Sequence, residues 1–217
     1  MPIMSVQEFE NVRWKEKPQK REFRHIAAAE LIAEGMVLDV GCGDGLLLSI
    51  LKESSIEAEG IDISEVAVAA CISKGLKAVQ GDFTVGSLPF ADHSFTTTVA
   101  LDVLEHVYDP GALLAEMERV ASKEIIIGVP NFSSLPARLQ VLFGKVPENN
   151  RPNKGHLQWF NWPVLTKISG QTNLAVREVK VNAPWERIPV LGGLTKGLAY
   201  AWPNLFALSF VVKYAKR

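Results

Sequence analysis

The spacing of hydrophobic and polar residues predicts alternating strands and helices over the first 130 residues. A short apolar run ends at three glycines, and the next segment carries apolar side chains at helical spacing. Ser64 and the Asp109-Pro110 pair are helix-start signals further along. Strands that alternate with helices of this length pair in parallel, so this region is doubly wound α/β. The predicted strands cover 36–40, 58–62, 77–80, 95–101 and 124–129, and the predicted helices cover 46–54, 66–73 and 111–121.

Beyond Pro130 the alternation becomes less regular, as expected of a region that elaborates a substrate side. The pattern predicts a helix, a polar loop, a second helix and two further strands, separated by an apolar segment rich in Pro, Gly and aromatic residues. We find no internal repeat and no linker. The predicted ranges are 135–143 (helix), 145–156 (loop), 163–170 (helix), 175–181 (strand), 184–204 (apolar connection) and 205–214 (strand).

The composition describes a folded and nearly neutral chain. Hydrophobic residues at 47% and charged residues at 22% exclude wholesale disorder, and 23 basic against 24 acidic residues predict no polyanion-binding surface. The longest charge-free run, 197–212, is interrupted by Pro203 and is too short to span a membrane. No secretion signal is recognisable at the start. Cys42 and Cys71 are too few for a disulfide scaffold, so we expect a cytoplasmic protein.

Three glycines lie directly between a predicted strand and a predicted helix. Gly41, Gly43 and Gly45 can adopt positive φ and let a ligand approach the backbone closely. Asp62 ends the next strand, 21 residues after Gly41, close to the roughly 20-residue offset at which a carboxylate meets ribose hydroxyls. In an open parallel sheet, ligands bind at the carboxyl ends of the strands. The spacing therefore predicts a nucleoside site.

The turn favours a cationic ligand over a dinucleotide. Its spacing is Gly-x-Gly-x-Gly, and Leu46 stands where a dinucleotide-binding turn has Gly or Ala. Asp44 lies inside the turn, where its negative charge opposes a pyrophosphate and favours an ammonium or sulfonium. A nicotinamide-dependent oxidoreductase is disfavoured on both grounds.

The motifs together resemble those of the class I S-adenosylmethionine-dependent methyltransferases. The resemblance covers residues 35–131 strongly and 155–170 more weakly, and it is carried by VLDVGCGDG (37–45), GIDIS (60–64), GDF (81–83) and LPF (88–90). It implies a Rossmann-like, doubly wound, seven-stranded and mostly parallel sheet with an antiparallel last strand. We expect one domain over 1–217, with a helical arm (1–34), a cofactor-binding core (35–131), a substrate-side elaboration that includes the sixth strand (132–204) and a last strand (205–217).

A second set of residues resembles MetW, a group of methyltransferase-like proteins associated with methionine biosynthesis. It consists of VPNF (129–132), ARL (137–139) and GKVP (144–147). This resemblance implies an alternative to an enzyme. The chain would then be a cofactor-binding accessory protein that acts through an acyltransferase partner of methionine biosynthesis without transferring methyl groups.

The family resemblance implies a role for each matching position in holding S-adenosylmethionine, or S-adenosylhomocysteine as product. Gly41 and Gly43 bracket the methionine portion, and Cys42 between them is also explained as a small residue in a crowded turn. Asp62, followed by Ile63, holds the ribose hydroxyls. Asp82 accepts a hydrogen bond from the adenine amino group, and Phe83 lies beside the adenine ring.

The remaining cofactor positions have structural alternatives. Asp39 either orders the glycine turn or is purely structural. Leu101 and Asp102 line the floor of the site after the fourth strand. The spacing of Asp102 and Glu105 is also a helix-start capping pattern, so capping and ligand contact stay open for Asp102.

His106 is the candidate catalytic base. It follows the fourth strand, near the sulfonium end of the site, and the ordinary pKa of histidine leaves the imidazole neutral at physiological pH. The structural alternative is a helix-terminal histidine bonded to backbone, and a capping or packing role is expected for His156. We expect no metal, because the histidines lie far apart in the sequence without metal-ligand spacing; they are His25, His93, His106 and His156.

Two segments suggest further contacts. Residues 13–24 carry six basic residues, which could guide an acidic substrate, but a solvated arm that packs Phe23 and Ile26 on the sheet edge is favoured. Nucleic acid is disfavoured, because no recognition module accompanies this charge. The apolar segment 184–204 has three interpretations: an apolar substrate lid, a contact with a protein or membrane surface, and core packing, which we favour.

These features favour a methyltransferase that acts on an oxygen or nitrogen of a small-molecule acceptor. The MetW-like accessory role is the main alternative, and the oxidoreductase is the least favoured. Oligomeric state and acceptor identity are not encoded in these patterns.

Overall fold

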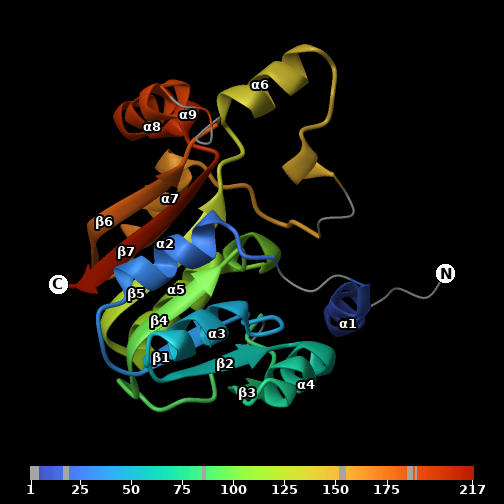
Figure 1. Cartoon of the computed structure of the whole chain (residues 1–217), viewed down its shortest axis with the longest axis vertical. Coiled ribbons are helices and arrows are strands. Elements are labelled where there is room, and N and C mark those ends of the chain that lie inside the picture. The colour runs from blue at the N-terminus through green and yellow to red at the C-terminus, as the bar shows by residue number, and fades with distance from the viewer. Residues whose placement is uncertain (1–4, 17–19, 85–86, 152–154, 185–187, 189) are drawn as a thin grey trace.

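The structure is a computed structural model that describes residues 5–16, 20–84, 87–151, 155–184, 188 and 190–217 (Figure 1). In this part of the chain, seven strands form one sheet in the order β3-β2-β1-β4-β5-β7-β6. β7 is antiparallel to β5 and β6, whereas the pairs among β1 to β5 are parallel. The predicted fold class is confirmed. The strands are β1 Val37–Val40, β2 Ala58–Asp62, β3 Lys77–Gln80, β4 Phe95–Leu101, β5 Ala121–Pro130, β6 Leu174–Asn182 and β7 Ser209–Lys216.

Helices cover both faces of this sheet. α2 and α3 pack on one face, and α5 and α7 pack on the other (Figure 1). α1 lies against α4, beyond the β3 side of the sheet, while α6, α8 and α9 lie at the end where α7 begins. The helical bounds are α1 Val6–Glu16, α2 Phe23–Leu31, α3 Leu46–Glu53, α4 Glu65–Ser73, η1 Leu104–His106, α5 Pro110–Val120, α6 Leu135–Leu142, η2 Glu148–Asn150, α7 Trp162–Ser169, α8 Leu191–Ala201 and α9 Pro203–Phe206.

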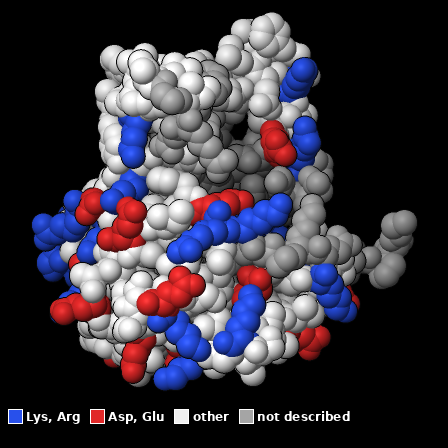
Figure 2. All heavy atoms as spheres, in the orientation of Figure 1, with Lys and Arg blue, Asp and Glu red and all other residues white. Residues whose placement is uncertain are grey.

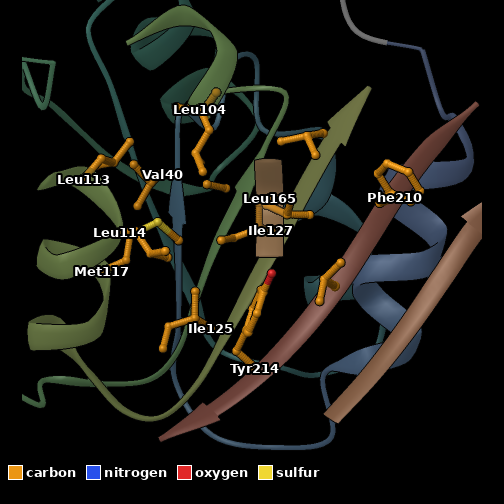
Figure 3. Close-up of a cluster of buried hydrophobic side chains, with 14 of the residues drawn as sticks. Val40, Leu104, Leu113, Leu114, Met117, Ile125, Ile127, Leu165, Phe210 and Tyr214 are labelled. Atoms are coloured by element: carbon orange, nitrogen blue, oxygen red, sulfur yellow. The ribbon is translucent and has the colours of Figure 1, made fainter. Parts of the chain in front are cut away.

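The central strands are apolar on both sides because both faces are covered. In β5, Ile125 and Ile127 point to the α5 side, whereas Ile126 between them points to the α2 side, and all three are fully buried. Figure 3 shows side chains of α5, β5 and β7 converging on the first of these two layers, among them Met117 of α5 and Tyr214 of β7. Complete burial of an aliphatic side chain contributes about 1.5–3 kcal/mol to stability. These two layers fix the strand ends that carry the site.

Three local predictions differ from the structure. The last strand begins at Ser209, because Pro203 starts the short helix α9 where we expected strand. The connection before it contains the helix α8. The arm packs α2 over the sheet face formed by β4, β5 and β7 and not on an edge, and Ile26 is exposed while Ala27 and Leu31 are buried. The single-domain organisation stays a prediction.

Candidate functional site

The order of the strands creates a crevice at the carboxyl ends of β1 and β4. The chain runs from β1 outward through β2 to β3 and then returns to β4 on the other side of β1. The connections that leave β1 and β4 therefore diverge, and such a switch point is where open α/β sheets bind ligands. The predicted site residues lie in the last residues of β1, β2 or β4 or in the segments that follow β1 to β4, and they gather at this edge.

The glycine turn after β1 has the backbone that only glycine adopts readily. Gly41, Gly43 and Gly45 have φ of +73°, +54° and +81°. A Cβ on Gly41 would lie 2.4 Å from Cγ2 of Val103, in the segment after β4. The Gly41 N–H donates to the carbonyl of Ile61 at 2.8 Å, which ties the turn to the end of β2. The turn is therefore held tightly between β2 and the β4 connection.

Asp62 is fixed by two backbone N–H groups. Its Oδ2 accepts from the Gly43 N–H at 2.8 Å and its Oδ1 from the Ser64 N–H at 2.9 Å. The residue is buried, and this burial raises the pKa of Asp62 to about 6. The two hydrogen bonds lower the pKa, but their effect is smaller than that of burial. Each carboxylate oxygen keeps a lone pair for a further donor. Asp62 thus presents an oriented acceptor at the point predicted for ribose hydroxyls.

Asp39 lies beneath the turn, near Asp62. Burial and then the charge of Asp62 raise the pKa of Asp39 to about 8. The carboxyl is therefore protonated over most of the physiological range. A neutral buried acid at this place suits the ordering role that was one of its two interpretations.

A cleft of about 400 Å³ adjoins the ends of β2 and β3. Ile63, Asp82 and Thr84 line one side of it, and residues 5–7 at the start of α1 and Tyr108 line the other. Asp82 is exposed, and its Oδ1 accepts from the N–H and the hydroxyl of Thr84 at 2.8 and 2.6 Å, whereas Phe83 is buried. Small-molecule pockets have this size. Another hollow, of about 300 Å³, lies at the opposite, amino ends of the same strands and is not part of this edge.

Leu101 and Asp102 occupy the end of β4. Asp102 has a φ of +55°, and its N–H donates to the carbonyl of Gly128 at 2.9 Å. Its carboxylate pairs with Nε of Arg24, from α2, at 3.1 Å. The N-cap position of η1 is taken by Val103, so the capping interpretation of Asp102 is wrong. One basic residue of the arm therefore stabilises the floor of the crevice.

Two residues of the glycine turn face away from a ligand. The Asp44 carboxylate pairs with Nζ of Lys74 at the end of α4, at 3.0 Å, and the same Nζ donates to the Asp44 carbonyl. The expectation that its charge faces a cationic ligand is wrong, because the carboxylate is paired with Lys74. The glycine motif did not reveal this partner, which comes 30 residues later in the sequence. Cys42 packs so closely that a Cβ on Gly60 would lie 2.5 Å from its sulfur. Any cofactor contact of Cys42 therefore has to involve its backbone.

His106 and His156 lie side by side, contrary to the expectation that the histidines stay apart. Their ring centroids are 4.7 Å apart, and Nδ1 of His106 is 3.1 Å from the Gly155 carbonyl. Burial and then the neighbouring His156 lower the pKa of His106 to about 4, so the imidazole is neutral at pH 7. Glu105, which the sequence marked only as part of a capping pattern, is buried next to them. The absence of paired spacing in the sequence therefore does not exclude a metal here.

Helix α1 also reaches the crevice, and no sequence signal predicted this. The Ser64 hydroxyl donates to Oδ1 of Asn11 at 2.6 Å, while the same hydroxyl caps α4 by accepting from the Ala67 N–H. Phe9, two residues earlier, lies against Gly155, where an added Cβ would be 3.2 Å from its ring. α1 thus contacts both the Asp62 side and the His106 side of the crevice.

Comparison with known proteins identifies the family. The model of the family described as "Methionine biosynthesis protein MetW" matches residues 20–207, which is most of the chain. The chain belongs to the MetW family. The match includes all the predicted site residues, from Asp39 to His106, and the 155–170 segment. MetW-family membership agrees with the class I methyltransferase architecture of the sheet.

Curated relatives and solved structures extend this result. This MetW-family chain is 30% identical over 169 residues to an ajmaline N-methyltransferase of Rauvolfia serpentina, covering 70% of the chain and 55% of that protein. It is 28% identical over 168 residues to the bifunctional methionine biosynthesis protein MetXA/MetW of Rhodopirellula baltica, covering 69% of the chain and 26% of that protein. The chain thus spans about half or less of the length of these relatives.

The fold closely matches that of a solved methyltransferase. Magnesium protoporphyrin IX methyltransferase (ChlM) from Synechocystis PCC 6803, solved with bound S-adenosylhomocysteine, superposes with a TM-score of 0.69. Sequence identity is 16%, and the match covers 98% of each chain, so it shows the fold alone. Among the described residues, no helix is long and apolar enough to cross a membrane.

Proposed function

We propose that this MetW-family chain binds S-adenosylmethionine and transfers its methyl group to an oxygen or nitrogen of a small-molecule acceptor. The observation that carries the proposal is Asp62, a buried carboxylate held by Gly43 and Ser64 at the switch point of the sheet. The donors available there suit the ligand, since ribose hydroxyls can donate to Asp62 and an adenine amino group to Asp82. The adjoining cleft of about 400 Å³ suits a nucleoside.

Bound S-adenosylmethionine supplies a methyl group on a sulfonium, which a nucleophile displaces in line. The chain contributes alignment of the acceptor and exclusion of water, and such reactions need few catalytic side chains. The glycine turn fits the methionine portion, and Gly41, Cys42 and Gly43 contact it through backbone. Asp62 and Ile63 hold the ribose, Asp82 and Phe83 hold the adenine, and the floor is formed by Leu101 and Asp102, with Asp39 beneath the turn.

His106 is the proposed catalytic residue on the acceptor side. If its Nδ1–H donates to the Gly155 carbonyl, the lone pair lies on Nε2, where it can take the acceptor's proton. A pKa of about 4 makes this imidazole a weak base. A weak base suffices for an oxygen acceptor, because an oxygen that gains a methyl group before it loses its proton becomes a strong acid.

Calorimetric titration of the purified chain with S-adenosylhomocysteine and with NADH tests the proposal. We expect saturable binding of S-adenosylhomocysteine and no binding of NADH. Asp62→Ala should weaken this binding at least about tenfold, whereas Glu34→Ala, an exposed acid before the opposite end of β1, should not. Heat with NADH alone, or equal affinity in Asp62→Ala, would contradict the proposal. His106→Ala should keep the affinity and lose turnover.

A second function is favoured by the surface around α6 and α8. Exposed apolar side chains gather there, and Figure 2 shows few charged side chains over that end of the molecule. Core packing of the 184–204 segment is therefore wrong for its large apolar side chains that the structure describes, whereas Ala199 of α8 is buried in the core; Trp185 lies outside the described residues. The exposed residues include Leu142 at 75%, Phe143 at 73%, Val190 at 92%, Leu194 at 61% and Trp202 at 61%.

This surface supports an accessory role through an acyltransferase partner as the second proposed function, with a membrane surface as another occupant. A relative whose name pairs MetXA with MetW favours a protein partner. The test is co-elution with the methionine-biosynthesis acyltransferase of the same organism. Leu142→Ser with Phe143→Ser should abolish co-elution and keep binding of S-adenosylhomocysteine. Ile72→Ser, an exposed residue on α4, is the control. Co-elution that the paired variant does not change would exclude this surface.

A further inference from the structure

Three side chains that the proposed cofactor site does not use converge on its acceptor side. Glu105, His106 and His156 each offer one ligand atom, and these three atoms lie within 4.8 Å of one another. Two of the residues belong to η1, directly after β4. The third, His156, lies near the start of the described segment 155–184. The cluster thus joins the cofactor-binding core to the substrate-side part of the chain.

Backbone hydrogen bonds fix this convergence. The N–H groups of Leu157 and Gln158 donate to the Glu105 carbonyl at 2.7 and 3.0 Å, and the Gln158 side chain donates to the Tyr108 carbonyl at 3.1 Å. The segment after His156 is therefore attached along η1 and not merely adjacent to it. The imidazole of His156 also packs edge-on against Phe132, with ring centroids 5.4 Å apart. A site made of these residues is built in advance of any ligand.

The Glu105 carboxylate lacks a partner for both of its oxygens. The residue is 1% exposed, and neither Oε1 nor Oε2 has a hydrogen-bond partner among the described residues. A buried carboxyl group that makes no hydrogen bond costs several kcal/mol relative to water, so native proteins rarely keep one without a ligand or a functional reason. Neutral His106 cannot donate to it while its one N–H donates to the Gly155 carbonyl. A cation shared by the three side chains would satisfy the carboxylate.

The hydrogen bond of His106 is also typical of a metal-binding histidine. His106 places Nδ1 3.1 Å from the Gly155 carbonyl, and donation of the Nδ1–H leaves Nε2 as the ligand atom. A ligand histidine in metal sites usually donates its other N–H to a carbonyl or carboxylate in this way, which fixes its tautomer and orientation. Two imidazoles and one carboxylate are a donor set that binds Zn²⁺ and other divalent transition metals, with a coordination position left open.

We propose that Glu105, His106 and His156 form a binding site for one divalent transition-metal ion of the Zn²⁺ type, open on the side where the acceptor would bind. Binding of the ion needs no further reaction. Its use in methyl transfer rests on the proposed function. There a bound ion would lower the pKa of an acceptor hydroxyl; the O–H proton would pass to solvent, the oxygen lone pair would form the new O–C bond, and the S–C electron pair would stay on sulfur. With the ion bound, Nε2 of His106 is a ligand; in the metal-free chain it is the base proposed above.

The test is a titration of the chelator-treated, full-length chain with Zn²⁺ by calorimetry, and with Co²⁺ by visible absorption. We expect one ion per chain. Glu105→Gln and His156→Ala should each weaken Zn²⁺ binding by about tenfold or more. His93→Asn is the matched control, because His93 is an exposed histidine with a positive φ that asparagine tolerates, and this variant should bind as the wild type does. Thermal unfolding in the presence of chelator checks that each variant folds.

Two outcomes would overturn the metal site: no saturable binding, or binding that both Glu105→Gln and His156→Ala leave unchanged. Should Glu105→Gln fail to fold, His156→Ala decides alone, since His156 lies outside regular secondary structure and only half-buried. Titration of the same chelated protein with S-adenosylhomocysteine separates this proposal from the preceding one. Cofactor binding without Zn²⁺ binding removes the metal site alone, and Zn²⁺ binding without cofactor binding removes the methyltransferase proposal alone.

Discussion

Two buried acids at the ends of neighbouring strands dominate the electrostatics of the site at the residue scale. Burial is the main cause that raises the pKa of Asp39 to about 8 and the pKa of Asp62 to about 6. The deeper acid is therefore neutral when the shallower one is ionised. One acid can support the turn while the other accepts hydrogen bonds, and the pair avoids two adjacent negative charges in a low dielectric.

Asp39→Asn should stabilise the cofactor-free chain increasingly between pH 4 and pH 8. The folded state keeps a proton on Asp39 that the unfolded chain releases near pH 4, so the wild-type free energy of unfolding falls as pH rises through this window. The difference from the variant grows by at most about 1.4 kcal/mol per pH unit. Urea unfolding at several pH values measures it.

Asp92→Asn is the control for this experiment. Asp92 is exposed, and its hydrogen bond with Arg119 holds its pKa below the ordinary value. Its contribution to stability is present throughout the range above pH 4, so the effect of Asp92→Asn should not grow between pH 5 and pH 8. A difference between wild type and Asp39→Asn that stays flat over the same range would show that Asp39 ionises freely in the fold.

The sequence identified the residues that follow each strand but not where their side chains point. Asp62 and Asp82 could be placed because a strand end fixes the position of the next residue. Asp44 could not, since Lys74, which pairs with it, belongs to a different helix. The contact between His106 and His156 depends on backbone hydrogen bonds across 50 residues, and no local pattern encodes those.

At the scale of elements, the start of α4 joins three parts of the site. The Ser64 hydroxyl accepts from the Ala67 N–H and donates to Asn11 of α1, while the Ser64 N–H donates to Asp62. One serine thus caps a helix, attaches α1 and helps to orient the proposed ribose acceptor. The cap was predicted from the sequence, whereas the attachment of α1 was not.

Ser64→Ala should lower the free energy of unfolding by about 1 kcal/mol, because it removes the N-cap hydrogen bond of α4 and the bond to α1. Asn11→Ala should cost less, since the cap survives. Ser73→Ala is the matched control, because its hydroxyl lies at the exposed far end of the same helix. Urea unfolding of the three variants measures the effect. Equal stability of Ser64→Ala and Ser73→Ala would mean that the cap contributes nothing.

The elements that sequence patterns missed depend on distant contacts. α8 contains Gly192, Gly193 and Gly197, which lower helix propensity, so a connection was expected. α9 overlaps the start of the apolar run 205–214, which we predicted to be a strand. Nδ2 of Asn131, at the end of β5, donates to the carbonyls of Pro203, Asn204 and Ala207, which stabilises the short helix and its end. By contrast, the regular strands and helices were predicted because strands buried on both faces are continuous apolar runs, whereas the helices between them carry apolar residues at helical spacing.

At the scale of the whole molecule, the proposed ligands act at different parts of the carboxyl edge of the sheet. The cofactor crevice gathers residues from the carboxyl ends of β1 to β4 and from α1, whereas the exposed apolar surface lies on α6, which follows β5, and on α8, which precedes β7. Since these regions share no described element, substitutions in one should leave the other intact. This separation makes cofactor binding and partner binding compatible, and it allows each to be tested without disturbing the other.

Saturating S-adenosylhomocysteine should therefore stabilise the entire fold. A ligand that binds only the folded state at 100 times its Kd adds about 2.7 kcal/mol, which for a chain of this size raises Tm by roughly 5–10 °C. Differential scanning fluorimetry of wild type, Asp62→Ala and Leu142→Ser with Phe143→Ser measures the shift. The shift should fall to about half or less in Asp62→Ala, as expected for a tenfold or greater loss of affinity, and persist undiminished in the surface variant, because only the former loses an acceptor in the crevice. A shift of equal size with NADH, or one that is undiminished in Asp62→Ala, would place the ligand somewhere other than the switch point.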